Sequence, residues 1–167
     1  MASIDAGTVE WFYKHKKEFL DKAMPKVTRL GDAGAVWLAM TAALILQKDK
    51  RKTGMACLSA LGIDSVLCNL VIKPIVRRPR PFKTRTLGSL LIREPKDPSF
   101  PSGHTSASFA MTTALLCEDS PLWLPSLIIS ILIGISRMYL HVHYLSDVAA
   151  GALIGVACGK VGADIVK

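Results

Sequence analysis

Length, composition and charge restrict this chain to a small set of protein classes. It has 167 residues, enough for one domain with a buried core, and 50% of them are apolar before its 12 glycines are counted, which is high for a soluble domain. The formal net charge of +8 favours an anionic partner such as a phosphorylated substrate or an anionic lipid surface. Aromatic residues make up only 7%, too few for a surface that stacks bases, so we expect no nucleic-acid partner.

Cysteine spacing and the N-terminal sequence further restrict the classes of protein to which the chain can belong. The four cysteines lie singly within apolar runs, so we expect buried free thiols, with neither a disulfide framework nor a metal site. The first residues lack the short apolar core and small-residue cleavage site of a signal peptide. Insertion into a membrane is therefore expected to use the segments described below.

The first segment, residues 1–30, is predicted to be an amphipathic helix lying at a membrane surface. Between Thr8 and Leu30, aromatic and aliphatic side chains are interleaved with five lysines. Such a helix places its apolar side chains in the headgroup layer and its cations toward phosphates and water. A surface helix of a soluble domain would show the same pattern, so this segment alone leaves both possibilities open. Pro25 is expected to bend or end the helix.

Residues 31–167 contain five apolar runs, which we predict to be the helices of a catalytic bundle. The runs are Ala33–Leu46, Gly54–Ile72, Thr105–Cys117, Leu122–Ile135 and Val148–Val166. A soluble bundle would need polar outer faces, whereas these runs are apolar nearly all round. Glycines at 151, 155 and 159 would permit close helix packing in a membrane. We therefore predict an all-α integral membrane protein, a single domain over residues 1–167 with about five transmembrane helices.

A stiff basic segment, Lys73–Pro81 with the sequence KPIVRRPRP, follows the second run. It carries one lysine and three arginines on a backbone restrained by three prolines. Guanidinium groups bind phosphate oxygens through paired hydrogen bonds, and a stiff backbone loses less entropy in presenting them. On its own, such a loop could equally contact lipid headgroups.

The third run opens with Pro101-Ser102-Gly103-His104. A Ser-Gly pair at a helix start leaves backbone N–H groups free beside the positive end of the helix dipole, where an anion can bind. His104, just inside the helix, could donate a proton. An ordinary N-cap at Ser102 with an incidental histidine explains this segment equally well in isolation.

Arg137, His143 and Asp147 lie between the fourth and fifth runs. If the fifth run is helical from about Tyr144, the Asp147 carboxylate lies one turn from His143 and can reach its imidazole. Each residue alone is more simply an interfacial histidine or a cation at a helix end. Five membrane crossings, however, bring all three polar segments to the same side, which predicts one site assembled from separate helix ends.

Together the three segments resemble the type 2 phosphatidic acid phosphatase superfamily. Six residues separate Lys73 from Arg80-Pro81, PSGH stands at 101–104, and Ser136-Arg137 is followed by His143 after five residues and by Asp147 after three more. The resemblance implies a bacterial membrane lipid phosphatase, and members of this type hydrolyse undecaprenyl diphosphate, phosphatidylglycerophosphate or phosphatidic acid. The match extends over about half the chain.

The resemblance also implies a role for each motif residue. His143 would attack phosphorus and form a phosphohistidine, Asp147 would fix its tautomer, and His104 would protonate the leaving oxygen and then activate water. The residues that would bind the phosphoryl group are Lys73, Arg80, Ser102, Gly103 and Arg137. Because these cations would offset the charge of the transition state, no metal or other cofactor is expected. His141 matches no motif position and is expected to be structural.

Two other functions stay open on the sequence. One is an acid phosphatase of the same superfamily acting on soluble phosphate esters, and the other is a membrane binding or transport protein that recognises an anion without turnover. The resemblance implies a multi-pass protein of the cell membrane, surrounded by membrane lipids, with its active site on the extracytoplasmic face. The count of positive charges opposes that orientation, because most cations lie on the side of the motifs.

Overall fold

The computed structural model describes residues 3–85 and 89–167, and these residues form helices and connecting turns without a strand. The longer helices are α1 (Ser3–Lys14), α2 (Glu18–Arg29), α3 (Ala35–Leu46), α4 (Arg51–Ser65), α7 (Gly103–Cys117), α8 (Trp123–Tyr139) and α9 (Leu145–Ile165). The short elements are the 3₁₀ turns η1 (Asp32–Gly34) and η2 (Lys48–Lys50), the π-helical η3 (Val66–Ile72), α5 (Lys73–Val76) and α6 (Pro81–Thr84). The predicted all-α fold is confirmed.

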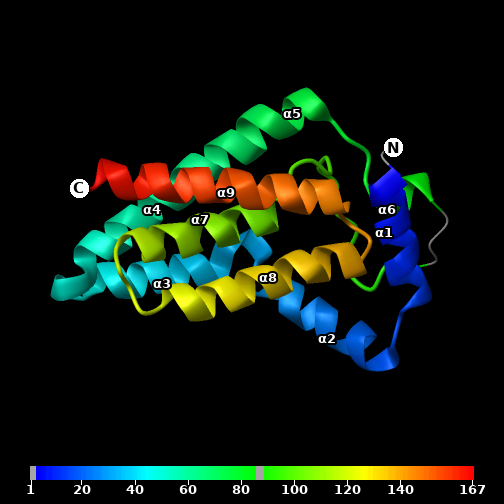
Figure 1. Ribbon diagram of the computed structural model, residues 1–167, viewed down its shortest axis with the longest axis horizontal. Coiled ribbons are helices and arrows are strands. Elements are labelled where there is room, and N and C mark those ends of the chain that lie inside the picture. Colours follow the sequence, from blue (N-terminus) through cyan, green and yellow to red (C-terminus); the bar gives the residue numbers. More distant parts are fainter. Residues whose placement is uncertain (1–2, 86–88) are drawn as a thin grey trace.

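The five predicted apolar runs are the five helices of the bundle. Figure 1 shows α3, α7, α8 and α9 running side by side, with α4 crossing behind them and continuing through η3 into α5. Helix α7 lies at the centre and packs against α4, α8 and α9. A Cβ atom at Gly151 of α9 would lie 2.7 Å from the Ser102 carbonyl oxygen, so glycine is required for this close approach of the two helices.

Polar and apolar side chains are distributed as in a protein surrounded by lipid. The outer faces carry large aliphatic side chains, and Leu70 and Leu153 are 71% and 73% exposed. Inside the bundle, serine and threonine hydroxyls bond between helices, and the Trp37 indole donates to the Ser108 hydroxyl at 3.0 Å. Because lipid does not drive apolar faces inward, close packing and such buried hydrogen bonds hold the helices together.

Among the described residues, length and composition identify two helical segments that could cross a bilayer, residues 48–84 and α9. A third crossing is possible if α2 and the segment Asp32–Leu46, which meet at a bend of 43°, form one broken span. Helix α8 is apolar but has 17 residues, and α7 has 15, both short of the about 20 that span the hydrocarbon layer. The bundle therefore has the predicted number of helices, but several are shorter than a full span.

The predicted N-terminal amphipathic helix is two helices in the structure. Helix α1 ends at Lys14, and α2 begins at Glu18 after Lys17 adopts an extended conformation. Tyr139 fixes this break, because its hydroxyl accepts the Lys17 N–H at 3.3 Å and donates to the Asp21 carboxylate at 2.6 Å. Pro25, which is expected to bend or end the helix, lies inside α2, so it does not end it.

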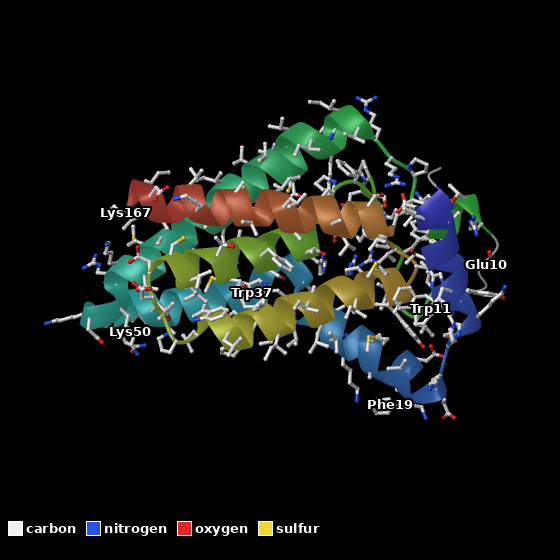
Figure 2. The ribbon with its side chains drawn as sticks, in the orientation of Figure 1. Glu10, Trp11, Phe19, Trp37, Lys50 and Lys167 are labelled. Carbon is white, nitrogen blue, oxygen red and sulfur yellow. The ribbon has the colours of Figure 1, made fainter. Side chains whose placement is uncertain are left out.

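The two ends of the bundle differ in character. Figure 2 shows Lys50 and Lys167 at one end and Glu10, Trp11 and Phe19, all from α1 and α2, at the other. Helix α1 lies across the second end, beside the start of α9 (Figure 1). All four cysteines are free thiols; Cys117 is half-buried and the other three are buried.

Candidate active site

The three motif segments meet at the end of the bundle that α1 covers. The Ser102 N–H donates to the Asp147 carbonyl oxygen at 3.0 Å, and the Arg80 guanidinium donates to the Val142 carbonyl oxygen at 2.8 Å. One cavity of about 1000 Å³ is lined by six of the eight predicted site residues, namely Lys73, Arg80, Gly103, His104, Arg137 and His143. The predicted convergence of separate helix ends is confirmed.

The other two predicted residues, Ser102 and Asp147, lie behind the cavity wall. Ser102 is fully buried, and its hydroxyl is bonded to the Thr105 hydroxyl at 2.9 Å. Its side chain therefore holds the start of α7 and does not line the cavity, contrary to the expectation of a direct substrate ligand. Gly103 does line it, and a Cβ atom there would lie 3.4 Å from the Lys73 Nζ atom, which is an ordinary van der Waals contact.

Backbone geometry directs Arg80 into the site. Arg77 adopts a left-handed conformation (φ 49°, ψ 35°) that ends α5, and Arg80 is extended before α6. The Arg80 guanidinium is 3% exposed and donates to the Asp97 backbone carbonyl oxygen at 2.9 Å as well as to Val142. Both acceptors are backbone carbonyl oxygens, so main-chain contacts hold the Arg80 guanidinium in place.

Three buried cations, Lys73, Arg80 and Arg137, lie together where the sequence predicts a phosphate clamp, and we call them the clamp cations. They are 8%, 3% and 3% exposed. Arg137 donates from Nη1 to the Thr28 hydroxyl at 2.7 Å, whereas its buried Nε has no hydrogen-bond partner among the described residues. Since a buried donor of this kind costs free energy unless an acceptor reaches it, the clamp fits an oxygen-rich anion.

Asp97 belongs to the clamp although the sequence reasoning missed it. Its carboxylate accepts from the Lys73 ammonium at 2.6 Å and from the Arg80 guanidinium at 2.9 Å. Burial alone would raise the pKa of Asp97, but the hydrogen bond and charge of Lys73, with the charge of Arg80, lower this pKa to about 2. Asp97 lies in an irregular loop without hydrophobic periodicity. Its negative charge within a basic stretch is the sequence signal that could have identified it.

His143 is a neutral, buried imidazole. It lies in the turn between α8 and α9. Burial lowers its pKa to about 3. The nearby Asp147 carboxylate opposes this shift, while the positive charges of Arg137 and Arg80 lower the pKa further. Its Nε2 atom lies 3.1 Å from Nη1 of Arg80, which is a donor, so the lone pair is on Nε2 and the proton on Nδ1. A neutral imidazole with its lone pair toward the clamp is a nucleophile.

Asp147 faces the other side of this imidazole. The His143 Nδ1 atom lies 3.6 Å from the nearer Asp147 oxygen, which is ion-pair range but longer than a hydrogen bond, and Nδ1 has no hydrogen-bond partner among the described residues. The same carboxylate accepts the Tyr144 N–H at 2.9 Å, which closes a capping box at the start of α9, and also the Ser99 hydroxyl. The predicted spacing of four residues thus places the carboxylate beside the ring.

His104 pairs with a residue that the sequence reasoning also missed. Its Nε2 atom lies 2.9 Å from the Asp32 carboxylate of η1, at the bend between α2 and α3. His141, by contrast, is buried outside the cavity lining, with its ring edge-on to Tyr13, as expected of a structural residue.

Beyond the cations, the cavity continues between α3 and α4. Leu38, Leu58 and Leu61 line this part, and Leu38 and Leu58 are 48% and 43% exposed. A cavity with a cationic end and an apolar wall fits an amphiphilic anion.

Comparison with known proteins is consistent with this geometry. Residues 53–167 match the family described as the PAP2 superfamily. The chain is 36% identical over 121 residues to an undecaprenyl-diphosphatase of Sulfolobus acidocaldarius, which covers 72% of this chain and 58% of that protein. It is 28% identical over 145 residues to the undecaprenyl-diphosphatase BcrC of Bacillus subtilis, covering 87% of this chain and 74% of that protein.

A solved structure has the same fold. The transmembrane PAP2-type phosphatidylglycerolphosphate phosphatase of Bacillus subtilis superposes with a TM-score of 0.78 at 24% identity, over 98% of this chain and 84% of that chain. The bundle, including its short helices, therefore has the fold of that transmembrane protein. The chain spans less than two thirds of the length of the Sulfolobus relative.

Proposed function

Because the chain belongs to the PAP2 superfamily, we propose that it is a lipid phosphatase that removes phosphate from a lipid phosphate or diphosphate. One observation carries the proposal: three buried cations and two histidines line a single cavity whose far wall is apolar and partly exposed. The cations suit the phosphoryl group, and the apolar wall suits the lipid to which it is attached.

In the proposed first step, His143 Nε2 attacks phosphorus while the bond from phosphorus to the leaving oxygen breaks. His104 gives a proton to that oxygen, so the lipid departs as an alcohol or, from a diphosphate, as a monophosphate. Asp147 stabilises the positive charge that His143 acquires, because its carboxylate faces Nδ1. The product is a phosphohistidine.

In the second step, His104 takes a proton from water, and the oxygen of this water attacks phosphorus. The bond between phosphorus and Nε2 breaks, which restores the neutral imidazole and releases inorganic phosphate. In both steps Lys73, Arg80 and Arg137 hold the non-bridging oxygens, and these fixed charges stabilise the transition state without reorganising. The start of α7 at Gly103 adds a backbone N–H.

The substrate is proposed to be a lipid of a membrane in which this protein is embedded. Relatives named undecaprenyl-diphosphatase make a polyprenyl diphosphate the first candidate, with phosphatidylglycerophosphate and phosphatidic acid as the others. We further propose that the motif end faces the extracytoplasmic side, which puts the basic η2 end in the cytoplasm. A cysteine replacing Glu10 should then react from outside the cell with a membrane-impermeant thiol reagent, and one replacing Lys50 should not.

Phosphate release in detergent tests the function. We expect the purified protein to release phosphate from at least one of the three lipids, with and without chelator, and His143→Ala to release none. Release only from soluble esters would instead indicate an acid phosphatase, and lipid-phosphate binding without release would indicate a binding or transport protein. Strict dependence on a divalent cation would contradict the proposed mechanism.

A further inference from the structure

Helix α1 contacts the start of α9, the helix that carries Asp147 (Figure 1). Asp5 of α1 is 3% exposed, and its carboxylate accepts the Ser146 N–H at 3.0 Å and the Ser146 hydroxyl at 2.6 Å. That N–H is one of the donors left free in the first turn of α9, where the helix dipole also favours a negative charge. Asp5 therefore caps α9 from a segment about 140 residues away in the sequence.

Arg78 joins this carboxylate to the one behind the nucleophile. Its Nη2 donates to Asp5 at 2.7 Å, and its Nη1 donates to Asp147 at 2.6 Å and to the Ser146 hydroxyl at 2.7 Å. The guanidinium also lies 4.1 Å from the centre of the Tyr144 ring. The planar guanidinium donates from different nitrogens in two directions, so two carboxylates share this cation.

Arg78 does not line the cavity, and this separates it from the clamp cations. By occupying the far oxygen of Asp147, it leaves the other oxygen facing His143 Nδ1. Burial would raise the pKa of Asp5, but the hydrogen bonds from Ser146 and Arg78 lower it, so both carboxylates next to Arg78 are charged at neutral pH.

We propose that Asp5 and Arg78 are positioning residues that hold the Asp147 carboxylate in place behind His143, so that α1 supports the catalytic site through Asp5. This inference rests on the proposed phosphatase function. It identifies the N-terminal segment as a component of the site in addition to any contact it makes with the membrane.

Kinetics of conservative variants test the positioning. In Arg78→Lys, the ammonium keeps the charge but lacks the two separate donor nitrogens that reach Asp5 and Asp147, so we expect kcat to fall about 10-fold, which is about 1.4 kcal/mol, with KM within about twofold. Asp5→Asn should show a smaller fall of the same kind, because its amide oxygen can still accept the Ser146 N–H. Glu10→Gln is the matched control and should leave kcat unchanged. It removes the other carboxylate of α1, which forms an exposed ion pair with Lys14.

Trypsin provides a readout that does not depend on activity. Lys16 and Lys17 lie in the link between α1 and α2, and Lys17 is exposed in the folded protein. Release of α1 should let this link unfold into the active site of the protease, which speeds cleavage. Asp5→Ala should be cut there at least about fivefold faster than the wild type and Glu10→Gln, while its melting temperature identifies any variant that fails to fold.

The outcomes separate this inference from the proposed function. Unchanged kcat in folded Arg78→Lys and Asp5→Asn would refute the positioning role, and a rise in KM alone would place Arg78 in substrate binding instead. Unchanged cleavage in Asp5→Ala would refute the tether. A wild-type protein that binds lipid phosphates without releasing phosphate would overturn the function, while the trypsin result would still decide whether α1 is held by Asp5.

Discussion

Replacing Asp97 by asparagine should tighten the binding of phosphate. The Asp97 carboxylate accepts hydrogen bonds from two clamp cations, at 2.6 Å from Lys73 and 2.9 Å from Arg80, and a phosphoryl group needs the same donors. Substrate and Asp97 therefore compete for the same positive charges. Asparagine keeps the size and one acceptor oxygen of aspartate, but it removes the competing negative charge.

The pKa of Asp97 gives the size of the expected change in phosphate affinity. Its fall from 3.8 to about 2 corresponds to about 2.4 kcal/mol of favourable interaction between the charged carboxylate and its surroundings. Because 47% of the side chain is exposed, solvent screening reduces the part available to a competing phosphate to about 1 kcal/mol. This predicts that the inhibition constant of inorganic phosphate falls about fivefold in Asp97→Asn.

Competitive inhibition of lipid-phosphate hydrolysis by inorganic phosphate measures this constant. Glu94→Gln is the matched control, since Glu94 lines the same cavity from the same loop and has no ion pair with a clamp cation among the described residues. A higher inhibition constant in Asp97→Asn than in the wild type would refute the reasoning. It would mean that Asp97 orients Lys73 and Arg80 for the substrate and does not compete with it.

Three further predictions concern the nucleophile and the packing behind it. We expect His143→Ala to abolish phosphate release, and Asp147→Asn to remain folded by circular dichroism while kcat falls at least about 100-fold. The pKa of His143 is depressed in the folded protein, so between pH 6.5 and about 3 the unfolded chain binds a proton at His143 that the folded chain does not. The free energy of unfolding should therefore decrease as the pH falls through this range. In His143→Asn, which has no imidazole to titrate, the decrease should be smaller. Gly151→Ala should lose about 1–3 kcal/mol of stability and lower kcat, because its Cβ would lie 2.7 Å from the Ser102 carbonyl oxygen, whereas Gly7→Ala in α1 meets nothing within 4 Å and should not be destabilised.

The sequence predicts the bundle well because both signals involved are local. Apolar runs mark the helices without any knowledge of their partners, and the ends of the five runs agree with the structure to within a few residues. The spacing of His143 and Asp147 is likewise local, since a helix that begins at Leu145 brings two residues four apart together whatever surrounds it.

The sequence misses the residues whose meaning depends on long-range contacts. Arg78 is visible only as one of four cations in a stiff segment, and nothing local shows that it points at Asp147 and not at a substrate. Asp5 and Asp32 lie 141 and 72 residues from the groups they bond, so no sequence window contains both partners. The break between α1 and α2 has the same origin, because Tyr139 of α8 fixes it.

Two of the missed carboxylates, Asp97 and Asp5, offset buried positive charge together with Asp147, which the sequence did predict. A site made of buried cations carries a large cost of desolvation and mutual repulsion, so each positive group needs an anion or a strong acceptor nearby. Asp97 serves Lys73 and Arg80, while Asp147 and Asp5 serve Arg78. Arg137 differs, because its Nε has no acceptor and no carboxylate pairs with it among the described residues. A phosphoryl group that satisfies Arg137 therefore gains a contact for which no protein carboxylate competes. For this reason Arg137→Lys should weaken phosphate binding more than Lys73→Arg, which keeps its charge beside Asp97, and equal inhibition constants for the two variants would refute this ranking.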